Sequence, residues 1–322
     1  GLAVATTVLL TIGLMRNAAG GGQWVNVGKV FVFAVLILSG LWVVARQPLV
    51  DTGRALRPFF TGGFGGLIQA MGYTFIALQG FDLIAAVGGE VREPTKTLPR
   101  AMVLSLAIAL AIYLPLLFII TTVGTPAGMT VAAAAVEDPE AIVAIAAQQY
   151  LGPIGYWLVI VAAVLAMFSA LQANLFAASR IAHAMARDRT LPSPLGTLHA
   201  SRRTPVVALA VTGTLIAVIL LVLPDVSVAG AASSLIFLIT FALAHGLTIL
   251  VRRRSVRRPP PFRVPLFPVV QIVGGLACVG LAIFQGFAVP LAGVITVIWL
   301  SVGGVLFWGL FARRARRRDA AN

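Results

Sequence analysis

The chain has 322 residues, of which 59% are hydrophobic and only 11% are charged. Soluble domains carry about 25% charged residues, and a mean hydropathy of +0.99 leaves too little polar surface to coat a soluble globule of this size. The composition therefore excludes an ordinary cytosolic enzyme and a disordered chain. The apolar runs are long and continuous, which argues against an outer-membrane barrel, whose strands alternate apolar and polar residues. We predict an all-α, polytopic membrane protein.

A membrane-spanning helix needs about 20 predominantly apolar residues. The first candidate span is short by this measure, and the third is interrupted by Gly80 and Asp82. A long connection, 124–152, follows the fourth span and includes a short predicted surface helix at Ala141–Tyr150. We predict a single membrane domain over residues 1–322 with nine spans, at 2–15, 27–45, 64–91, 99–123, 154–184, 206–223, 228–251, 269–289 and 291–312.

Alternate connections between these spans are rich in arginine. They carry 20 basic residues on one side of the predicted bilayer and 3 on the other. Because basic loops stay on the cytoplasmic side, we predict a multi-pass protein of the cytoplasmic membrane with a cytoplasmic C-terminus. The blocks Arg252–Arg254 and Arg313–Arg318 act first as orientation signals, and they could also bind anionic lipid.

The sequence offers little support for nucleic-acid binding, metal binding or catalysis. The net charge of +14 comes from short blocks between spans, so we do not expect nucleic acid as a partner. Cys278 is the only cysteine, which excludes an intrachain disulfide and a cysteine-rich metal site. Motifs of metalloproteases, serine hydrolases and phosphate loops are absent from the sequence. We expect no metal and no cofactor.

The chain opens at Gly1 inside an apolar run, without an initiator methionine or the basic segment of a signal peptide. We therefore expect that the sequence begins within a helix and that upstream spans are missing.

Lys29 lies near the start of the second predicted span. One interpretation is a lysine that extends to the cytoplasmic interface. The other is a cation that replaces a coupling ion, because a desolvated lysine can release its proton whereas arginine cannot. The chain has only two lysines, and the other, Lys96, lies in a loop.

Asp82 lies in the middle of the third span, beside Gly80 and Gln79. Charged residues at this depth are costly and are functional candidates by default. Asp82 could cap a broken helix by accepting free backbone N–H groups, and it could also respond to protons beside a substrate site. The two interpretations are compatible, and both require a helix break at Gly80.

Four ordered motifs resemble the amino acid–polyamine–organocation superfamily. Phe75–Met102, FIALQGFDLIAAVGGEVREPTKTLPRAM, is similar to the family's sixth helix and following loop, although Gln79 and Glu93 depart from the usual residues. The other three are Ala178–Leu195, Arg202–Leu209 and Pro260–Val270, with Arg189 and Pro261 as departures. Together the motifs cover essentially the whole chain.

The resemblance implies a five-helix inverted-repeat transporter fold with a broken helix, in which the nine spans look like helices four to twelve. It implies that the break lines the substrate with Phe75, Ile76, Ala77, Gln79 and Gly80. It also implies that Lys29 takes the place of a sodium ion used by other members, with Ser169 as a hydroxyl partner near it.

The leading functional interpretation is a secondary transporter that moves amino acids by proton coupling or exchange. The alternative within transport is a polyamine or cationic amino-acid exchanger. A membrane-embedded enzyme would need a nucleophile–base pair or metal ligands, and a channel would need rings of like residues around a pore. The resemblance also implies that Ile76 stands where some members use an aromatic residue to cover the substrate, which favours a small or aliphatic substrate. A monomer and a homodimer both agree with the sequence.

Overall fold

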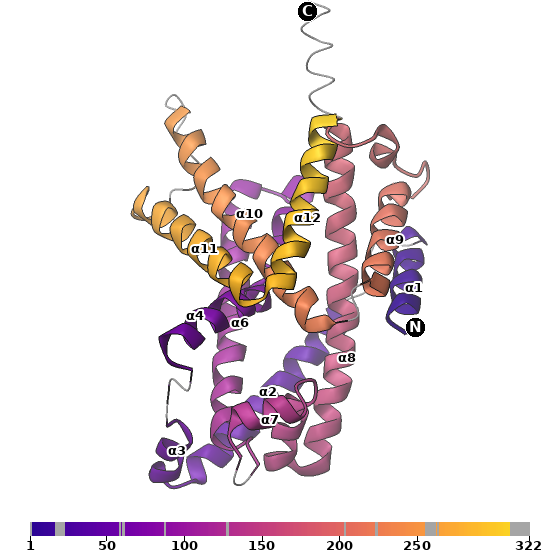
Figure 1. Cartoon of the computed structure of the whole chain (residues 1–322). Coiled ribbons are helices and arrows are strands. Elements are labelled where there is room, and N and C mark those ends of the chain that lie inside the picture. The colour runs from indigo at the N-terminus through magenta and orange to yellow at the C-terminus, as the bar shows by residue number, and fades with distance from the viewer. Residues whose placement is uncertain are drawn as a thin grey trace, which may run out of the picture. The chain divides into compact units, whose positions relative to one another are not determined.

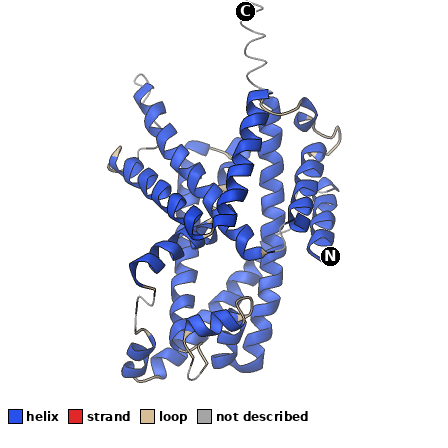
Figure 2. Ribbon diagram, viewed as in Figure 1, coloured by secondary structure: helices blue, strands red, loops and turns tan. Residues whose placement is uncertain are grey.

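The computed structural model describes residues 2–16, 23–57, 59, 62–86, 88–126, 129–202, 204–222, 225–254, 262 and 264–309. Every regular element in these ranges is a helix (Figure 2). Seven helices are long and apolar enough to cross a membrane. The prediction of an all-α, multi-pass membrane protein is therefore confirmed. The chain forms two compact units, and each is described by itself.

The first unit comprises residues 1–18, 62–102 and 175–322. It contains the start of one long helix, α6 (Pro94–Thr122), and the end of another, α8 (Ile142–Arg187). Its other elements are α1 (Leu2–Arg16), α4 (Gly63–Thr74), η1 (Phe75–Leu78), α5 (Leu83–Ala86), η2 (Gly88–Glu90), η3 (Ser193–Gly196), α9 (Val206–Val222), α10 (Val226–Arg254), α11 (Val269–Ala288) and α12 (Pro290–Phe307).

Helix α10 is the centre of this unit and contacts α4, η1, α11 and α12 (Figure 1). Small residues make the contact with α12 close, because Ala231, Ala232 and Ala292 form a buried cluster there. At the start of α10, the Asp225 carboxylate accepts hydrogen bonds from the amide and hydroxyl of Ser227. The hydroxyl bond is the larger cause of a lowered pKa at Asp225. This cap fixes the first turn of α10.

A separate pair of helices in the first unit, α1 and α9, lie side by side (Figure 1). Thr11 of α1 packs directly on Gly213 of α9, where any larger side chain would collide with it. Arg202 donates a 3.4 Å hydrogen bond to the Met15 carbonyl at the end of α1. Both helices are apolar but shorter than a typical span. That they cross the bilayer stays a prediction.

The second unit comprises residues 19–61 and 103–174. It contains α2 (Gln23–Arg46), α3 (Leu49–Ala55), α7 (Val131–Glu137) and most of α6 and α8. Leu36 of α2 is buried against Ala144, Ala147 and Val159 of α8. Gly40 gives room to the side chain of Ile119 from α6, so α2 approaches α6 closely.

Two features of the second unit differ from the sequence expectation. The short helices α3 and α7 were not predicted, since each has seven residues and no span-length apolar run. The predicted surface helix at Ala141–Tyr150 is the first part of α8, which continues through a kink at Gly152. Gly152 has φ +66°, and Pro153 follows it, so the kink has an identifiable cause.

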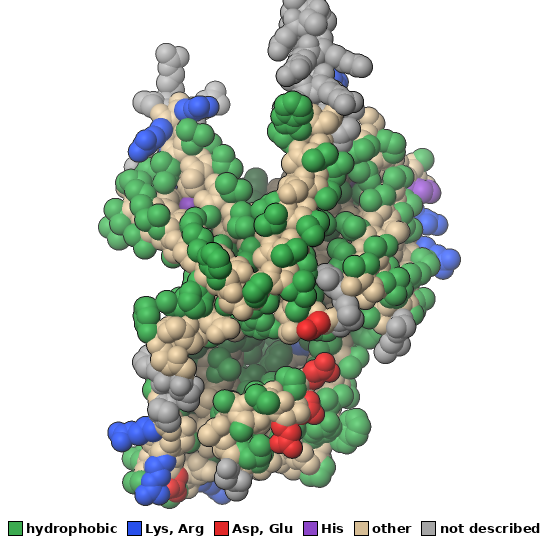
Figure 3. Space-filling view, in the orientation of Figure 1, with side chains coloured by type: hydrophobic (Ala, Val, Ile, Leu, Met, Phe, Trp, Pro, Cys, Tyr) green, Lys and Arg blue, Asp and Glu red, His purple; other side chains and the backbone are tan. Residues whose placement is uncertain are grey.

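Large hydrophobic side chains are widely exposed on this protein. Hydrophobic atoms cover most of the visible surface of α10, α11 and α12 (Figure 3), where Phe287 is 82% and Leu276 is 67% exposed. A soluble monomer rarely exposes apolar area on this scale. This surface fits a bilayer, which supplies no competing hydrogen bonds. Several orientation signals, at 203, 257, 258, 263 and 313–318, and residues 310–312 of the ninth predicted span, lie outside the described residues.

Candidate functional site

The third predicted span is broken at the position that the sequence indicated. Helix α4 ends at Thr74 and tightens into the 3₁₀ turn η1, after which Gln79 is extended. Gly80 then has φ +128°, a conformation that side-chain-bearing residues rarely adopt. Regular helix resumes only at Leu83. The break therefore combines a change of helix type with one glycine-dependent residue.

Asp82 caps this break locally. Its Oδ1 accepts a 3.0 Å hydrogen bond from the Gly80 amide. The Leu83 amide returns to the Gly80 carbonyl at 3.2 Å, and the Ala85 amide bonds to the Asp82 carbonyl at 2.9 Å. The carboxylate thus satisfies a backbone donor that a continuous helix would have paired. The donor precedes Asp82 by two residues, so the bond closes the break itself and differs from an ordinary N-cap, which accepts from the turn that follows it.

The predicted substrate residues all lie in this segment. Phe75 and Ile76 are half-buried in η1, and Ala77 is exposed. Gln79 donates its amide to the Ile76 carbonyl at 3.0 Å and ends the turn. Their backbone groups, rather than a cluster of charged side chains, dominate the local polarity, because Asp82 is the only charged residue between positions 63 and 86.

Helix α10 contacts both sides of the break, which the sequence reasoning missed. Ser234 is fully buried, accepts a 3.0 Å hydrogen bond from the Ile76 amide and donates one of 2.9 Å to the Tyr73 carbonyl. The ring of Phe241 lies 5.8 Å from that of Phe75 and 5.7 Å from that of Phe81. A hydroxyl in the middle of an apolar span was the available signal for Ser234.

A second buried polar residue, Gln285 of α11, packs against α4. Gln285 of α11 is fully buried, and within the described part of the chain neither of its amide atoms has a hydrogen-bond partner. It packs on Gly72, where a β-carbon would approach its Oε1 to 3.0 Å. Unpaired buried amides are rare in native structures. The unpaired amide of Gln285 therefore lowers the stability of the contact between α11 and α4, the helix that leads into the break.

Lys29 and Ser169 come together in the second unit. Lys29 of α2 is half-buried, and its Nζ donates a 3.0 Å hydrogen bond to Ser169 Oγ of α8. The two residues are 140 positions apart in the sequence. In the described ranges no carboxylate forms a salt bridge with Lys29. A cation held by a neutral hydroxyl can change its contact when it loses its proton.

Comparison with known proteins identifies the family. The amino acid permease family model matches residues 2–319. The chain belongs to the amino acid permease family. It is 33% identical over 330 residues to an uncharacterized transporter of Mycobacterium tuberculosis, which covers 100% of this chain and 69% of that protein. The resemblance to the superfamily found in the sequence is thereby confirmed.

Two relatives of the permease have named substrates. A branched-chain amino acid permease of Bacillus subtilis is 26% identical over 316 residues, covering 97% of this chain and 63% of that protein. A serine/threonine exchanger of the same organism is 28% identical over 274 residues, covering 84% of this chain and 60% of that protein. The chain therefore spans less than two thirds of the length of these two relatives.

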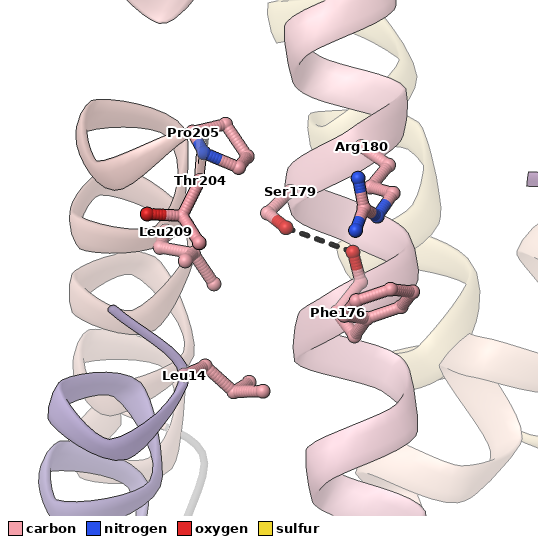
Figure 4. Close-up of a pocket in the computed structure, with 7 residues that line it drawn as sticks. All are labelled: Leu14, Phe176, Ser179, Arg180, Thr204, Pro205 and Leu209. Atoms are coloured by element: carbon pink, nitrogen blue, oxygen red, sulfur yellow. Dashed lines mark hydrogen bonds between the residues drawn. The ribbon is translucent and has the colours of Figure 1, made fainter. Parts of the chain in front are cut away.

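One cavity of the permease lies between α8 and the α1–α9 pair (Figure 4). Its volume is about 10 Å³, which holds one water at most. The Arg180 guanidinium stacks 4.1 Å from the centre of the Phe176 ring, and Ser179 donates to the Phe176 carbonyl. Thr204 Oγ1 is buried and finds no partner among the described residues. This cavity is too small for an amino acid.

A larger space of about 420 Å³ lies between α10 and α11. It is lined only by apolar side chains, those of Ile239, Ala242, Leu243, Val279, Ala282 and Ile283. The charged ends of an amino acid would have no polar partner there. Neither cavity includes a residue of the break. Among the described residues, His, Cys, Asp and Glu also form no cluster that could hold a metal ion.

Proposed function

We propose that this protein is a secondary transporter that moves amino acids across the cytoplasmic membrane by proton coupling or exchange. The observation that carries the proposal is the break between Thr74 and Leu83, where backbone groups leave the helix ladder within a span. Broken helices of this kind offer helix ends to substrates and ions in transporters. Membership in the amino acid permease family supports an amino acid as the substrate.

The break matches the two charged groups that all free amino acids share. The carbonyl end of α4 and η1 carries partial negative charge and suits the substrate's ammonium. The Gln79, Gly80 and Leu83 amides are paired within the break, so the substrate's carboxylate would be bound by the Phe81 amide, which has no hydrogen-bond partner among the described residues. The half-buried side chains of Phe75 and Ile76 then border the substrate's side chain. In this arrangement backbone groups bind the ammonium and carboxylate that all amino acids share, and protein side chains select the side chain of the substrate.

A small or aliphatic neutral amino acid fits this segment best. Asp82 is the only charged residue at the break, and its Oδ1 already accepts the Gly80 amide. A basic substrate would have only the remaining acceptor sites of this one carboxylate for its cationic end. The branched-chain permease and the serine/threonine exchanger among the relatives agree with this class.

Lys29 is the proposed proton-coupling residue. As an ammonium it donates to Ser169 Oγ and ties α2 to α8. As a neutral amine it would hold that contact less strongly, because hydrogen bonds from charged donors are roughly twice as strong. A proton would then bias the equilibrium between two access states, which is what coupling requires.

The test is uptake by the full-length protein in proteoliposomes. Labelled leucine and serine are compared with arginine and putrescine at several pH values. We expect saturable uptake of the neutral amino acids and a pH dependence that Lys29→Ala abolishes. Preferential uptake of arginine or putrescine would refute the substrate class, and absence of any amino acid uptake would refute the function.

Two matched variants sharpen the coupling test. Lys29→Arg keeps the charge but cannot release a proton, so it should also lose the pH dependence. Ser169→Ala removes the acceptor that favours the ammonium, so the pH profile should shift toward lower pH without disappearing. A Lys29→Ala variant with the wild-type profile would show that Lys29 is an interfacial residue and that coupling lies elsewhere.

A further inference from the structure

We propose that Ser234 of α10 is a positioning residue that holds the helix break in its substrate-binding form, with Phe241 supporting both sides of that break. The inference rests on the proposed function, since it concerns how the same site is kept open. It assigns to α10 a part in substrate binding that does not require contact with the substrate.

The hydroxyl of Ser234 bridges two backbone groups at the end of α4. A 3₁₀ turn would join the Ile76 amide directly to the Tyr73 carbonyl, three residues earlier. Here the Ile76 amide donates to Ser234 Oγ at 3.0 Å, and that hydroxyl donates to the Tyr73 carbonyl at 2.9 Å. A side chain inserted into a helix ladder is an established cause of a kink. Ser234 thus enters the backbone ladder where α4 passes into η1, about one turn before Gly80.

The burial of Ser234 makes this bridge hard to replace. Its exposed fraction is 0%, so water cannot readily take over its two hydrogen bonds. A hydroxyl offers one donor and can accept as well, and Ser234 uses both capacities on the break. Without the hydroxyl, the Tyr73 carbonyl and the Ile76 amide must either remain unpaired or approach each other. The second option would close the turn.

The same face of α10 reaches the far side of the break. Phe241 lies seven residues after Ser234, which is two turns along one helix face. Its ring contacts Phe75 before Gly80 and Phe81 after it. The Tyr73 hydroxyl also donates to the Ser227 carbonyl in the first turn of α10 at 3.3 Å. One rigid helix therefore holds both ends of the irregular segment.

A positioning role of this kind has a specific signature. Ser234 fixes the backbone of the segment that, in the proposed function, binds the ammonium and carboxylate common to all amino acids. Loss of Ser234 should therefore weaken the binding of all amino acid substrates by the same factor. A residue that selected the side chain would instead change the ratio between substrates.

The experiment compares three variants of the full-length protein. Ser234→Ala removes the hydroxyl, and Ser234→Cys keeps a group of similar size with weaker hydrogen bonding. Ser233→Ala is the matched control, because Ser233 makes no hydrogen bond to the described residues of the break. Dissociation constants are measured for alanine, serine and leucine in detergent. Amide hydrogen exchange over residues 73–80 is measured without substrate.

We expect Ser234→Ala to weaken the binding of all three substrates equally, by about tenfold, because the loss of a buried hydrogen bond typically has an effect of this size. Ser234→Cys should fall between it and the wild type, and Ser233→Ala should match the wild type. The Ile76 amide should exchange at a changed rate in Ser234→Ala, faster if it is left unpaired and slower if it closes onto the Tyr73 carbonyl. Unchanged affinity and exchange in Ser234→Ala, or an equal loss in Ser233→Ala, would overturn the inference.

The two proposals can fail separately. A wild-type protein that binds no amino acid contradicts the proposed function, while a changed rate of exchange at Ile76 in Ser234→Ala would still support the bridge. A wild-type protein that binds amino acids, together with a Ser234→Ala variant that binds them equally well, contradicts only the role of Ser234.

Discussion

Replacing Gly80 with alanine tests the break by the smallest available change. No heavy atom lies within 4 Å of the position that a β-carbon would occupy at Gly80, so alanine meets no steric obstacle from its neighbours. The backbone at Gly80 nevertheless has φ +128°, which is strained for any residue with a side chain. The substitution therefore isolates the conformational cost of the break from the cost of packing.

The magnitude follows from that conformation. A non-glycine residue in a sparsely populated backbone region costs roughly 1–3 kcal/mol. If the segment relaxes to avoid this cost, the Gly80 amide leaves Asp82 Oδ1, which now lies 3.0 Å away. The broken form then becomes less populated, and apparent substrate affinity falls by the same free energy. The expected loss is about 5- to 150-fold.

The assay is equilibrium binding of a labelled substrate, with thermal unfolding measured on the same samples. Gly280→Ala is the control, since Gly280 lies inside α11, has open space at its β-position and no positive φ. Alanine there should keep substrate affinity and stabilise the helix slightly. Affinity of Gly80→Ala within twofold of the wild type would refute the argument that the break forms the site.

Two further predictions concern stability and topology. Gln285→Met should raise the unfolding free energy by about 1–3 kcal/mol and the melting temperature by a few degrees, because it removes a buried amide without a partner; a destabilised variant would mean that the amide is paired in the membrane. A cysteine placed after Arg318, in a Cys278→Ala background, should resist impermeant thiol reagents in intact cells. Labelling at that cysteine would reverse the predicted orientation.

The sequence was sufficient for the local part of the site. Gly80 and Asp82 stand two positions apart in an apolar run, and a glycine beside a mid-span carboxylate already indicates a capped break. The hydrogen bond between them involves neighbours in the chain, so no tertiary information was needed to expect it. The presence of several long apolar helices was also predictable, because continuous apolar length marks a candidate span.

The remaining part of the site depends on packing that no local pattern encodes. Ser234 follows Tyr73 by 161 positions, and only the contact of α10 with α4 brings them together. Phe241 looks like an ordinary apolar residue in its span, although it contacts the break on both sides. The short helices α3 and α7 were missed because they have no apolar length that marks them.

Four polar residues within the spans fall into two groups, and the grouping predicts how each responds to substitution. Asp82, Ser234 and Lys29 each have a hydrogen-bond partner, and in each case the partner belongs to the break or to a facing helix. Removing such a residue leaves its partner unpaired, which costs more than the bond itself contributed. Gln285 has no partner among the described residues, so an apolar replacement removes a cost instead. A polar residue in a span therefore points to function when its partner is irregular backbone or a side chain on another helix. Gln285 meets neither condition, and this is why we expect its replacement to increase stability while replacement of Ser234 weakens binding.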